Sequence, residues 1–105
     1  MRSDLNESVR HEIGDELKSI LSAGFTVRES DYSEADFGNF YVDLLRGTDQ
    51  LRIIRDRGQY MVQGDEVELR RAGLWKAFDS KVEFFGALTS YAAELCTGSA
   101  RGGDP

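Results

Sequence analysis

The segment FGNFYVDLLRGTDQLRIIRDRGQYMVQ, residues 37–63, decides the fold of this chain. Apolar and polar side chains alternate along 39–46 and again along 50–56, which is the two-residue period of strands with one buried face. The short turn sequence at 47–49 joins these strands as antiparallel neighbours, and Arg57-Gly58 leads into a further strand over 59–63. The segment therefore predicts three consecutive strands of an antiparallel meander.

The alternation also assigns side chains to the two faces of the sheet. The core face is predicted to carry Phe40, Val42, Leu44, Leu51 and Ile53. The other face is predicted to carry Tyr41, Asp43, Leu45, Arg52 and Ile54, and it is either open to solvent or covered by a partner. Upstream, the alternation over 25–28 predicts a fourth strand, whereas 29–36 is too polar to be buried and is a loop or a strand end in solvent.

Two segments with helical periodicity flank the strands. Apolar residues recur at three- and four-residue steps from Leu5 to Leu21, which predicts a helix over 4–23 with Ser3 or Asp4 as its cap. Gly24 is a suitable residue to end it. The S-x-x-E pattern at Ser80-Lys81-Val82-Glu83 predicts the start of a second helix over 80–96, with an apolar stripe that begins at Val82.

The segment between the last predicted strand and the second helix is ambiguous. Residues 64–73 fit either a fifth short strand or an exposed loop, and Leu74, Trp75 and Phe78 are expected to close one end of the core. The fold class is α+β: an antiparallel four-stranded, or five-stranded, meander with the N-terminal and C-terminal helices packed on one face. We expect a single domain over 1–96 and a flexible tail over 97–105, which has no large apolar anchor.

The amino-acid composition limits the classes of binding partner and the cellular compartment that we expect. The chain of 105 residues has a formal net charge of −6, which disfavours direct binding to nucleic acid or to an anionic membrane. It has no apolar run of the roughly 18 residues that a membrane span requires. Cys96 is the single cysteine, so an intramolecular disulfide is impossible. These features predict a cytoplasmic protein.

Residues with catalytic or metal-binding chemistry are sparse. His11 is the single histidine and is expected in solvent, while Cys96 ends an apolar stripe and is expected in the core. The acids of 31–38 only half match a calcium loop, since the closing glutamate is missing. No glycine-rich phosphate loop occurs. We therefore expect neither an enzyme nor a metal or cofactor site.

Charge patterning offers two candidate partner-binding sites. The first is a group of acids with interspersed tyrosines, namely Glu29, Asp31, Tyr32, Glu34, Asp36, Tyr41 and Asp43. Such a group either steers a basic protein onto the surface or only solubilises a loop. The alternative site, near the predicted hairpin tip at 56–59, comprises Arg52, Arg55, Arg57 and Gln59. Turn formation alone explains Asp56 and Gly58 there, but it does not explain the arginines.

The order of helix, Ala23-Gly24-Phe25, Phe37-Gly38-Asn39, the segment 51–59 and closing helix resembles small bacterial α-β-β-β-β-α proteins over about residues 5–95. Some similar proteins are immunity proteins of polymorphic toxin or contact-dependent growth inhibition systems. The resemblance implies a non-catalytic inhibitor, as a monomer or in a 1:1 complex, that binds a cognate toxin, such as a basic nuclease, in the cytosol. It transfers no binding residue. The alternatives are a dimeric, acidic secretion-type chaperone that holds an effector segment, and a small ligand-binding protein.

Overall fold

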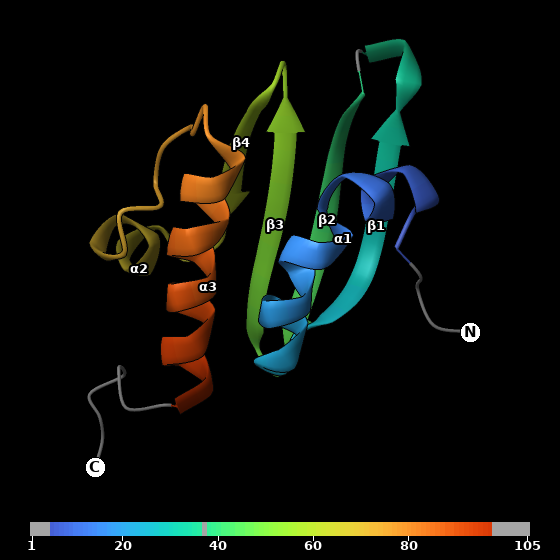
Figure 1. Cartoon of the computed structure of the whole chain (residues 1–105). Helices are drawn as coiled ribbons and strands as arrows, with labels where there is room; N and C mark the ends of the chain where they lie inside the picture. The colour runs from blue at the N-terminus through green and yellow to red at the C-terminus, as the bar shows by residue number, and fades with distance from the viewer. Residues whose placement is uncertain (1–4, 37, 98–105) are drawn as a thin grey trace.

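The structure is a computed structural model that describes residues 5–36 and 38–97. Its elements, shown in Figure 1, are α1 (Glu7–Ser22), β1 (Thr26–Ser33), a 3-10 turn (Glu34–Asp36), β2 (Asn39–Arg46), β3 (Asp49–Asp56), β4 (Gln59–Gln63), α2 (Glu66–Arg71) and α3 (Lys81–Thr97). Of the predicted tail, Thr97 is the last residue of α3, and the rest lies outside the described residues.

The strands form one four-stranded sheet in the order β1-β2-β3-β4, with every pair antiparallel, which confirms the predicted meander. The first hairpin turn is one residue shorter than expected, because Asp49 belongs to β3 and pairs with Arg46. The second turn lies at Arg57-Gly58 as predicted, and both residues have the positive φ that suits a two-residue hairpin.

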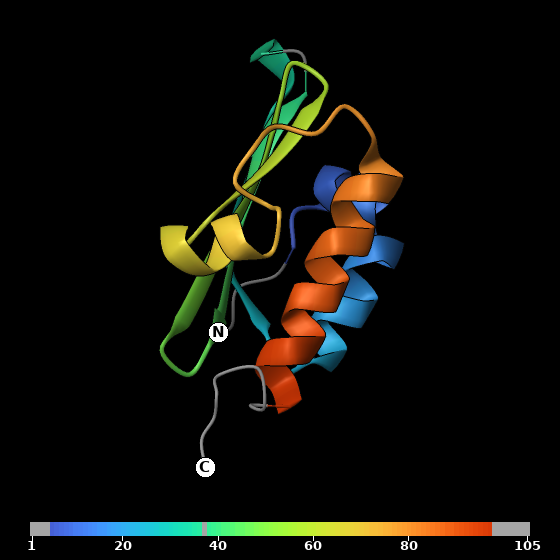
Figure 2. The same cartoon turned by 90° about the vertical axis from the view of Figure 1, so that its left-hand side faces the viewer.

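Both long helices, α1 and α3, lie on the same side of the sheet, as Figure 2 shows with the sheet seen nearly edge-on. This arrangement confirms the predicted α+β layering. The N-cap of α1 is Asn6, whose Oδ1 accepts hydrogen bonds from the backbone N–H groups of Ser8 and Val9. Ser3 and Asp4 lie outside the described residues. Gly24, with a φ of 106°, follows the end of α1 as expected.

The core fills the space between the helices and the sheet. Val9, Ile13, Leu17 and Ile20 of α1 are fully buried against it. An aromatic cluster holds the α3 side together, with ring centroids 5.0 to 6.5 Å apart in successive contacts of Phe40, Tyr60, Phe78, Phe84 and Phe85. The sheet therefore presents its other face away from both helices.

The segment 64–73 is neither a strand nor a loop but contains the helix α2. An alternation of apolar and polar residues over so short a segment fits one or two helical turns as well as a strand, and the local capping residues decide between strand and helix. Asp65 accepts a hydrogen bond from the backbone N–H of Glu68 at 3.1 Å, and Arg70 pairs with Glu66 one turn earlier at 2.7 Å. The free edge of β4 pairs instead with Phe78, through two 2.8 Å backbone bonds with Tyr60.

Two expectations about apolar residues are wrong. Leu74 and Phe78 are buried as predicted, but Trp75 is 40% exposed and borders a surface hollow with Ile54 and Met61. Val82 is 81% exposed: it lies in the first turn of α3, on the side away from the sheet. Of the polar segment 29–36, residues 29–33 extend β1 and 34–36 form the 3-10 turn, so the strand-end alternative is right for residues 29–33.

Within residues 5–36 and 38–97, no helix has the length and apolar character that crossing a membrane would require.

Candidate functional site

The sheet surface that faces away from α1 and α3, here called the outer face, brings most of the chemically distinctive side chains together. Because directly paired residues of antiparallel strands project on the same side, the register defines it. Its central members are Glu29 and Asp31 of β1, Tyr41, Asp43 and Leu45 of β2, Gln50, Arg52 and Ile54 of β3, and Met61 and Gln63 of β4. The two long helices lie on the other side, so neither covers it.

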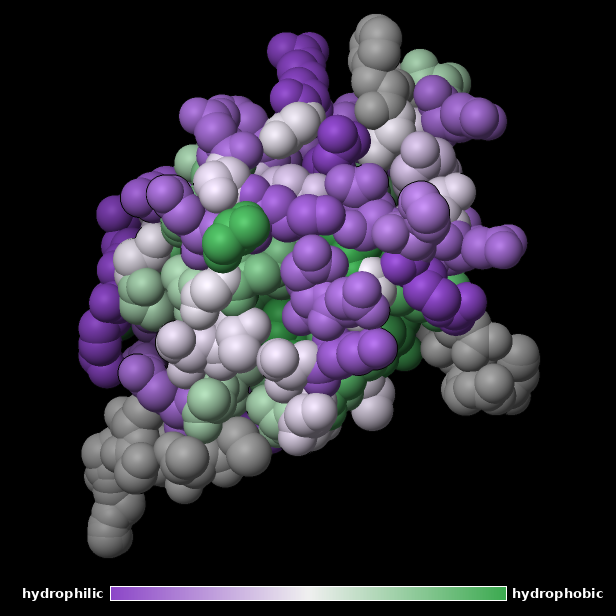
Figure 3. Space-filling view, viewed as in Figure 1, coloured by the Kyte–Doolittle hydropathy of each residue, from purple (hydrophilic) through white to green (hydrophobic). Residues whose placement is uncertain are grey.

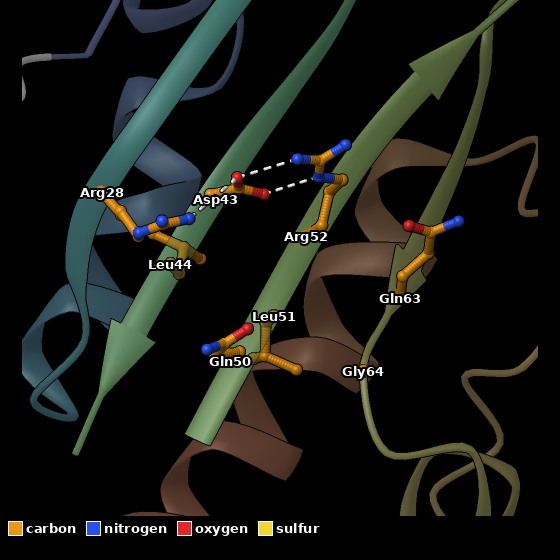
Figure 4. A pocket seen from close by; sticks show the side chains of 8 residues that line it. All are labelled: Arg28, Asp43, Leu44, Gln50, Leu51, Arg52, Gln63 and Gly64. Carbon is orange, nitrogen blue, oxygen red and sulfur yellow. Dashed lines mark hydrogen bonds and ion pairs between the residues drawn. The ribbon is translucent and has the colours of Figure 1, made fainter. Parts of the chain in front are cut away.

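Asp43 and Arg52 form the centre of the outer face. Arg52 donates two hydrogen bonds to the Asp43 carboxylate, from Nε to Oδ1 at 2.6 Å and from Nη2 to Oδ2 at 2.9 Å (Figure 4). Arg28, in the β-bulge of β1, approaches the same carboxylate at 3.9 Å. Asp43 is only 8% exposed although it lies on the outer face, and its carboxylate has both Arg52 and Arg28 as ion-pair partners. The hydrogen bonding that Arg52 donates to Asp43 raises the pKa of Arg52, which keeps the guanidinium charged.

Tyr41 extends this arrangement towards β1. The Arg52 guanidinium carbon lies 4.2 Å from the centroid of the Tyr41 ring, a cation–π contact. The Tyr41 hydroxyl donates to the Glu29 carboxylate at 3.0 Å, and this bond is the main cause that raises the pKa of Tyr41. The four side chains thus link β1, β2 and β3 in one network, which holds an arginine and a tyrosine in defined positions on an open surface.

Several shallow hollows lie on the outer face. One, of about 250 Å³, lies around the Asp43–Arg52 pair and is lined also by Arg28, Gln50 and Gln63 (Figure 4). Another, of about 230 Å³, lies at the β4 side between Ile54, Met61 and Trp75. In the opposite view, which looks onto α1 and α3, hydrophilic side chains cover much of the surface and hydrophobic atoms show mainly between them (Figure 3).

The residues of the acidic candidate site do not all lie on the same surface. Glu29, Asp31, Tyr41 and Asp43 share the outer face, and Glu34 is exposed in the 3-10 turn at one end of β1. Tyr32 lies on the helix side, where its ring stacks on Phe40 at 6.4 Å. Asp36 ends the 3-10 turn, and its side chain lies outside the described portion of the chain.

The residues of the basic candidate site also lie in different places. Arg52 joins the acidic group through Asp43, so the two predicted sites overlap at this residue. Arg55 is paired with Phe40 and Tyr60 on the helix side and donates to the Gly38 carbonyl at 3.1 Å. Arg57 and Gln59 remain at the hairpin tip. The Arg57 backbone N–H donates to Asn39 at 2.9 Å, and the Gln59 amide donates to Asp79 at 2.8 Å.

Several residues on or beside this surface belong to neither predicted site, among them Met61, Arg28 and Trp75, which line its hollows. Met61 follows from the alternation of β4, because it pairs with Ile54 of β3. Arg28 reaches Asp43 because of the bulge, and Trp75 arrives through the loop after α2, so neither has a signal in local periodicity. Among the described residues, no three His, Cys, Asp or Glu side chains gather as a metal site would require.

Fold and surface together define a small α+β protein with one sheet face covered by helices and the other carrying an ordered network of charged and aromatic side chains. Comparisons with protein-family models, curated proteins and solved structures found no match for the chain. The outer face is therefore the feature from which a function can be inferred.

Proposed function

We propose that this protein is a non-catalytic inhibitor that binds a basic toxin domain in the cytosol and neutralises it, the role of an immunity protein. The observation that carries the proposal is the outer face, which carries the acids of β1 at one edge, Tyr41 and Arg52 in the middle, and Met61 with the neighbouring Trp75 at the β4 side. Tyrosine, tryptophan, arginine and methionine are enriched where proteins bind one another, and opposite charge speeds the encounter.

The charge that attracts the partner comes from fewer acids than the sequence indicates. Asp43 is neutralised by Arg52, so it orders the face and offers no free charge. Glu29, Asp31 and Glu34 are exposed and form no ion pair with a described residue. These three acids lie along β1 and the 3-10 turn that follows it, and this acidic edge of the sheet attracts a positively charged protein surface, such as the substrate groove of a nuclease. The net charge of −6 on the whole chain adds to the attraction.

Mutation of these three acids tests the proposal. The partner is first isolated by affinity capture from the organism that encodes the protein, then purified, and the complex is reconstituted and its association rate measured. The variant Glu29→Gln/Asp31→Asn/Glu34→Gln should associate about tenfold more slowly at low ionic strength. The difference should shrink in 1 M salt, where the Debye length falls to about 3 Å.

A control variant with the same change in net charge is Glu7→Gln/Asp15→Asn/Glu83→Gln, whose three sites are exposed on α1 and α3. It should associate at close to the wild-type rate, because these acids lie on the helix side. Equal rates for the two triple variants would show that the β1 acids do not guide a partner. Inhibition must also be stoichiometric at 1:1, since a substoichiometric inhibitor would act catalytically.

A further inference from the structure

The hollow on the β4 side of the outer face is lined by the apolar residues Ile54, Met61, Val62, Trp75 and Ala77, together with Gln63 and Lys76. Trp75 lies there with 40% of its surface exposed, although it is the single tryptophan and the largest side chain of the protein. The Arg70 guanidinium lies 5.8 Å from the Trp75 ring centroid and holds one side of the indole. A large aromatic ring left at the rim of a hollow offers apolar contact area that the fold itself does not use.

The size of this hollow identifies the kind of occupant. Its volume is about 230 Å³, below the range of roughly 300–1,000 Å³ typical of pockets for free small molecules. It therefore suits one side chain of a larger molecule. Ile54 lines both this hollow and a neighbouring one formed with Asp31, Tyr41 and Arg52. The apolar hollow and the acidic edge thus belong to one continuous surface.

A second copy of the chain fits this surface poorly. Four strands about 4.8 Å apart and about 20 Å long give a face of roughly 400 Å², half of the roughly 800 Å² that each partner of a stable interface buries. Two copies also repel each other, because each carries a net charge of −6. A different protein of opposite charge avoids this repulsion, and it reaches a standard interface area by contacting the 3-10 turn and the edge of β1 as well.

We propose that the Trp75 hollow is an anchor pocket for one non-polar side chain, aliphatic or aromatic, of the basic partner whose positive charges face Glu29 and Asp31. The inference rests on the proposed function and specifies how its partner is held. The partner should present a basic patch and, about the width of the sheet away, a protruding apolar residue. The acids then govern how fast the complex forms, and the pocket governs how long it lasts.

The first test needs no partner. The amides N-acetyl-leucine amide and N-acetyl-phenylalanine amide are titrated into ¹⁵N-labelled protein as side-chain probes, with N-acetyl-glutamine amide as the polar control. We expect saturable shifts of the Trp75 indole N–H and of the Met61 and Ala77 backbone N–H signals with the apolar probes alone. Shifts that do not saturate, or that are as large near the exposed Val82, would overturn the inference.

The second test uses the purified partner and the emission of Trp75. Because this chain has no other tryptophan, the emission of the complex after subtraction of the partner's own emission should shift to the blue if the indole becomes buried. Trp75→Ala should weaken binding roughly 10- to 30-fold, mainly through faster dissociation, and Trp75→Phe should restore most of the affinity. Val82→Ala, which removes an exposed apolar side chain from the helix side, should change affinity by less than about twofold.

The outcomes separate the two proposals. If the acid variant associates slowly but Trp75→Ala binds like the wild type and the emission does not move, the inhibitor role stands and the anchor pocket is wrong. If both variants bind normally, the outer face is not the docking surface and both proposals fall. If the protein alone forms dimers with a blue-shifted Trp75 emission, a second copy occupies the pocket and the inference is wrong.

Discussion

The Asp43–Arg52 pair is the feature of the outer face whose energetic contribution is easiest to measure. A double-mutant cycle with Asp43→Asn, Arg52→Gln and the double variant isolates the coupling between the two side chains. The carboxylate accepts two short hydrogen bonds from the guanidinium, and the side chains are 11% and 42% exposed, respectively. The pair thus lies between a surface ion pair and a fully buried one.

This intermediate exposure sets the expected magnitude. Exposed pairs contribute about 0.2–1 kcal/mol, whereas breaking a buried pair costs about 3–5 kcal/mol. We expect a coupling of about 1–2 kcal/mol. Arg52→Gln should cost more than Asp43→Asn, because it leaves a nearly buried carboxylate with only Arg28 at 3.9 Å, while the freed Arg52 still reaches solvent.

Urea unfolding, followed by far-UV circular dichroism, gives the free energy of unfolding for the four proteins. The Glu66–Arg70 pair of α2 provides the control cycle, since its side chains are 51% and 61% exposed at a similar distance of 2.7 Å. It should show a coupling of at most about 0.5 kcal/mol, and that value should fall further in 1 M salt. A coupling at Asp43–Arg52 no larger than the control value would refute the view that this pair orders the outer face.

Further predictions concern the buried Tyr60 and two glycines, Gly86 in α3 and Gly64 after β4. Burial, reinforced by Glu12, raises the pKa of Tyr60 to about 12 from 10.0, so the protonated phenol contributes stability that is complete below pH 10 and is lost between pH 10 and 12. The wild type should therefore lose up to about 2–3 kcal/mol more than Tyr60→Phe over that interval in urea unfolding, and parallel pH profiles would contradict this. Gly86→Ala should stabilise α3 by about 0.5–1 kcal/mol, because a Cβ there meets nothing within 4 Å. Gly64→Ala should instead destabilise by about 1–3 kcal/mol, because its Cβ would lie 3.0 Å from the Gln50 carbonyl oxygen; a thermal melt in which the two variants shift in the same direction would contradict the packing.

The strands and long helices could be predicted because their signals are local. The turn at Arg57-Gly58, the strand Gln59–Gln63 and the serine cap of α3 occur where the sequence places them, since each depends on residues that are neighbours in the chain. The segment 64–73 is ambiguous for the same reason. Its alternation is too short to distinguish the periods of a strand and a helix, and the Asp65 cap decides for α2.

The candidate site could be predicted only incompletely. Alternation correctly places Tyr41, Asp43, Arg52 and Ile54 on the face away from the helices. The contact between Asp43 and Arg52 depends on the register, which a turn longer by one residue would shift, so that Asp43 would no longer lie opposite Arg52. The expected separation of acidic and basic sites therefore does not hold for Arg52.

By itself, the amino-acid sequence determined the α+β class, the meander and the residues of each sheet face, because side-chain periodicity along a strand or helix is a property of the local backbone. Only the tertiary structure decided that Arg52 binds Asp43 and stacks on Tyr41, that Tyr32 and Arg55 face the helices, and that Trp75 borders the outer face. Asp43 and Arg52 are 9 residues apart in the chain, and Ile54 and Trp75, which line the same hollow, are 21 residues apart. The strand register, the β-bulge and the paths of the loops determine which of these residues meet, and no periodic pattern in the chain encodes these three features.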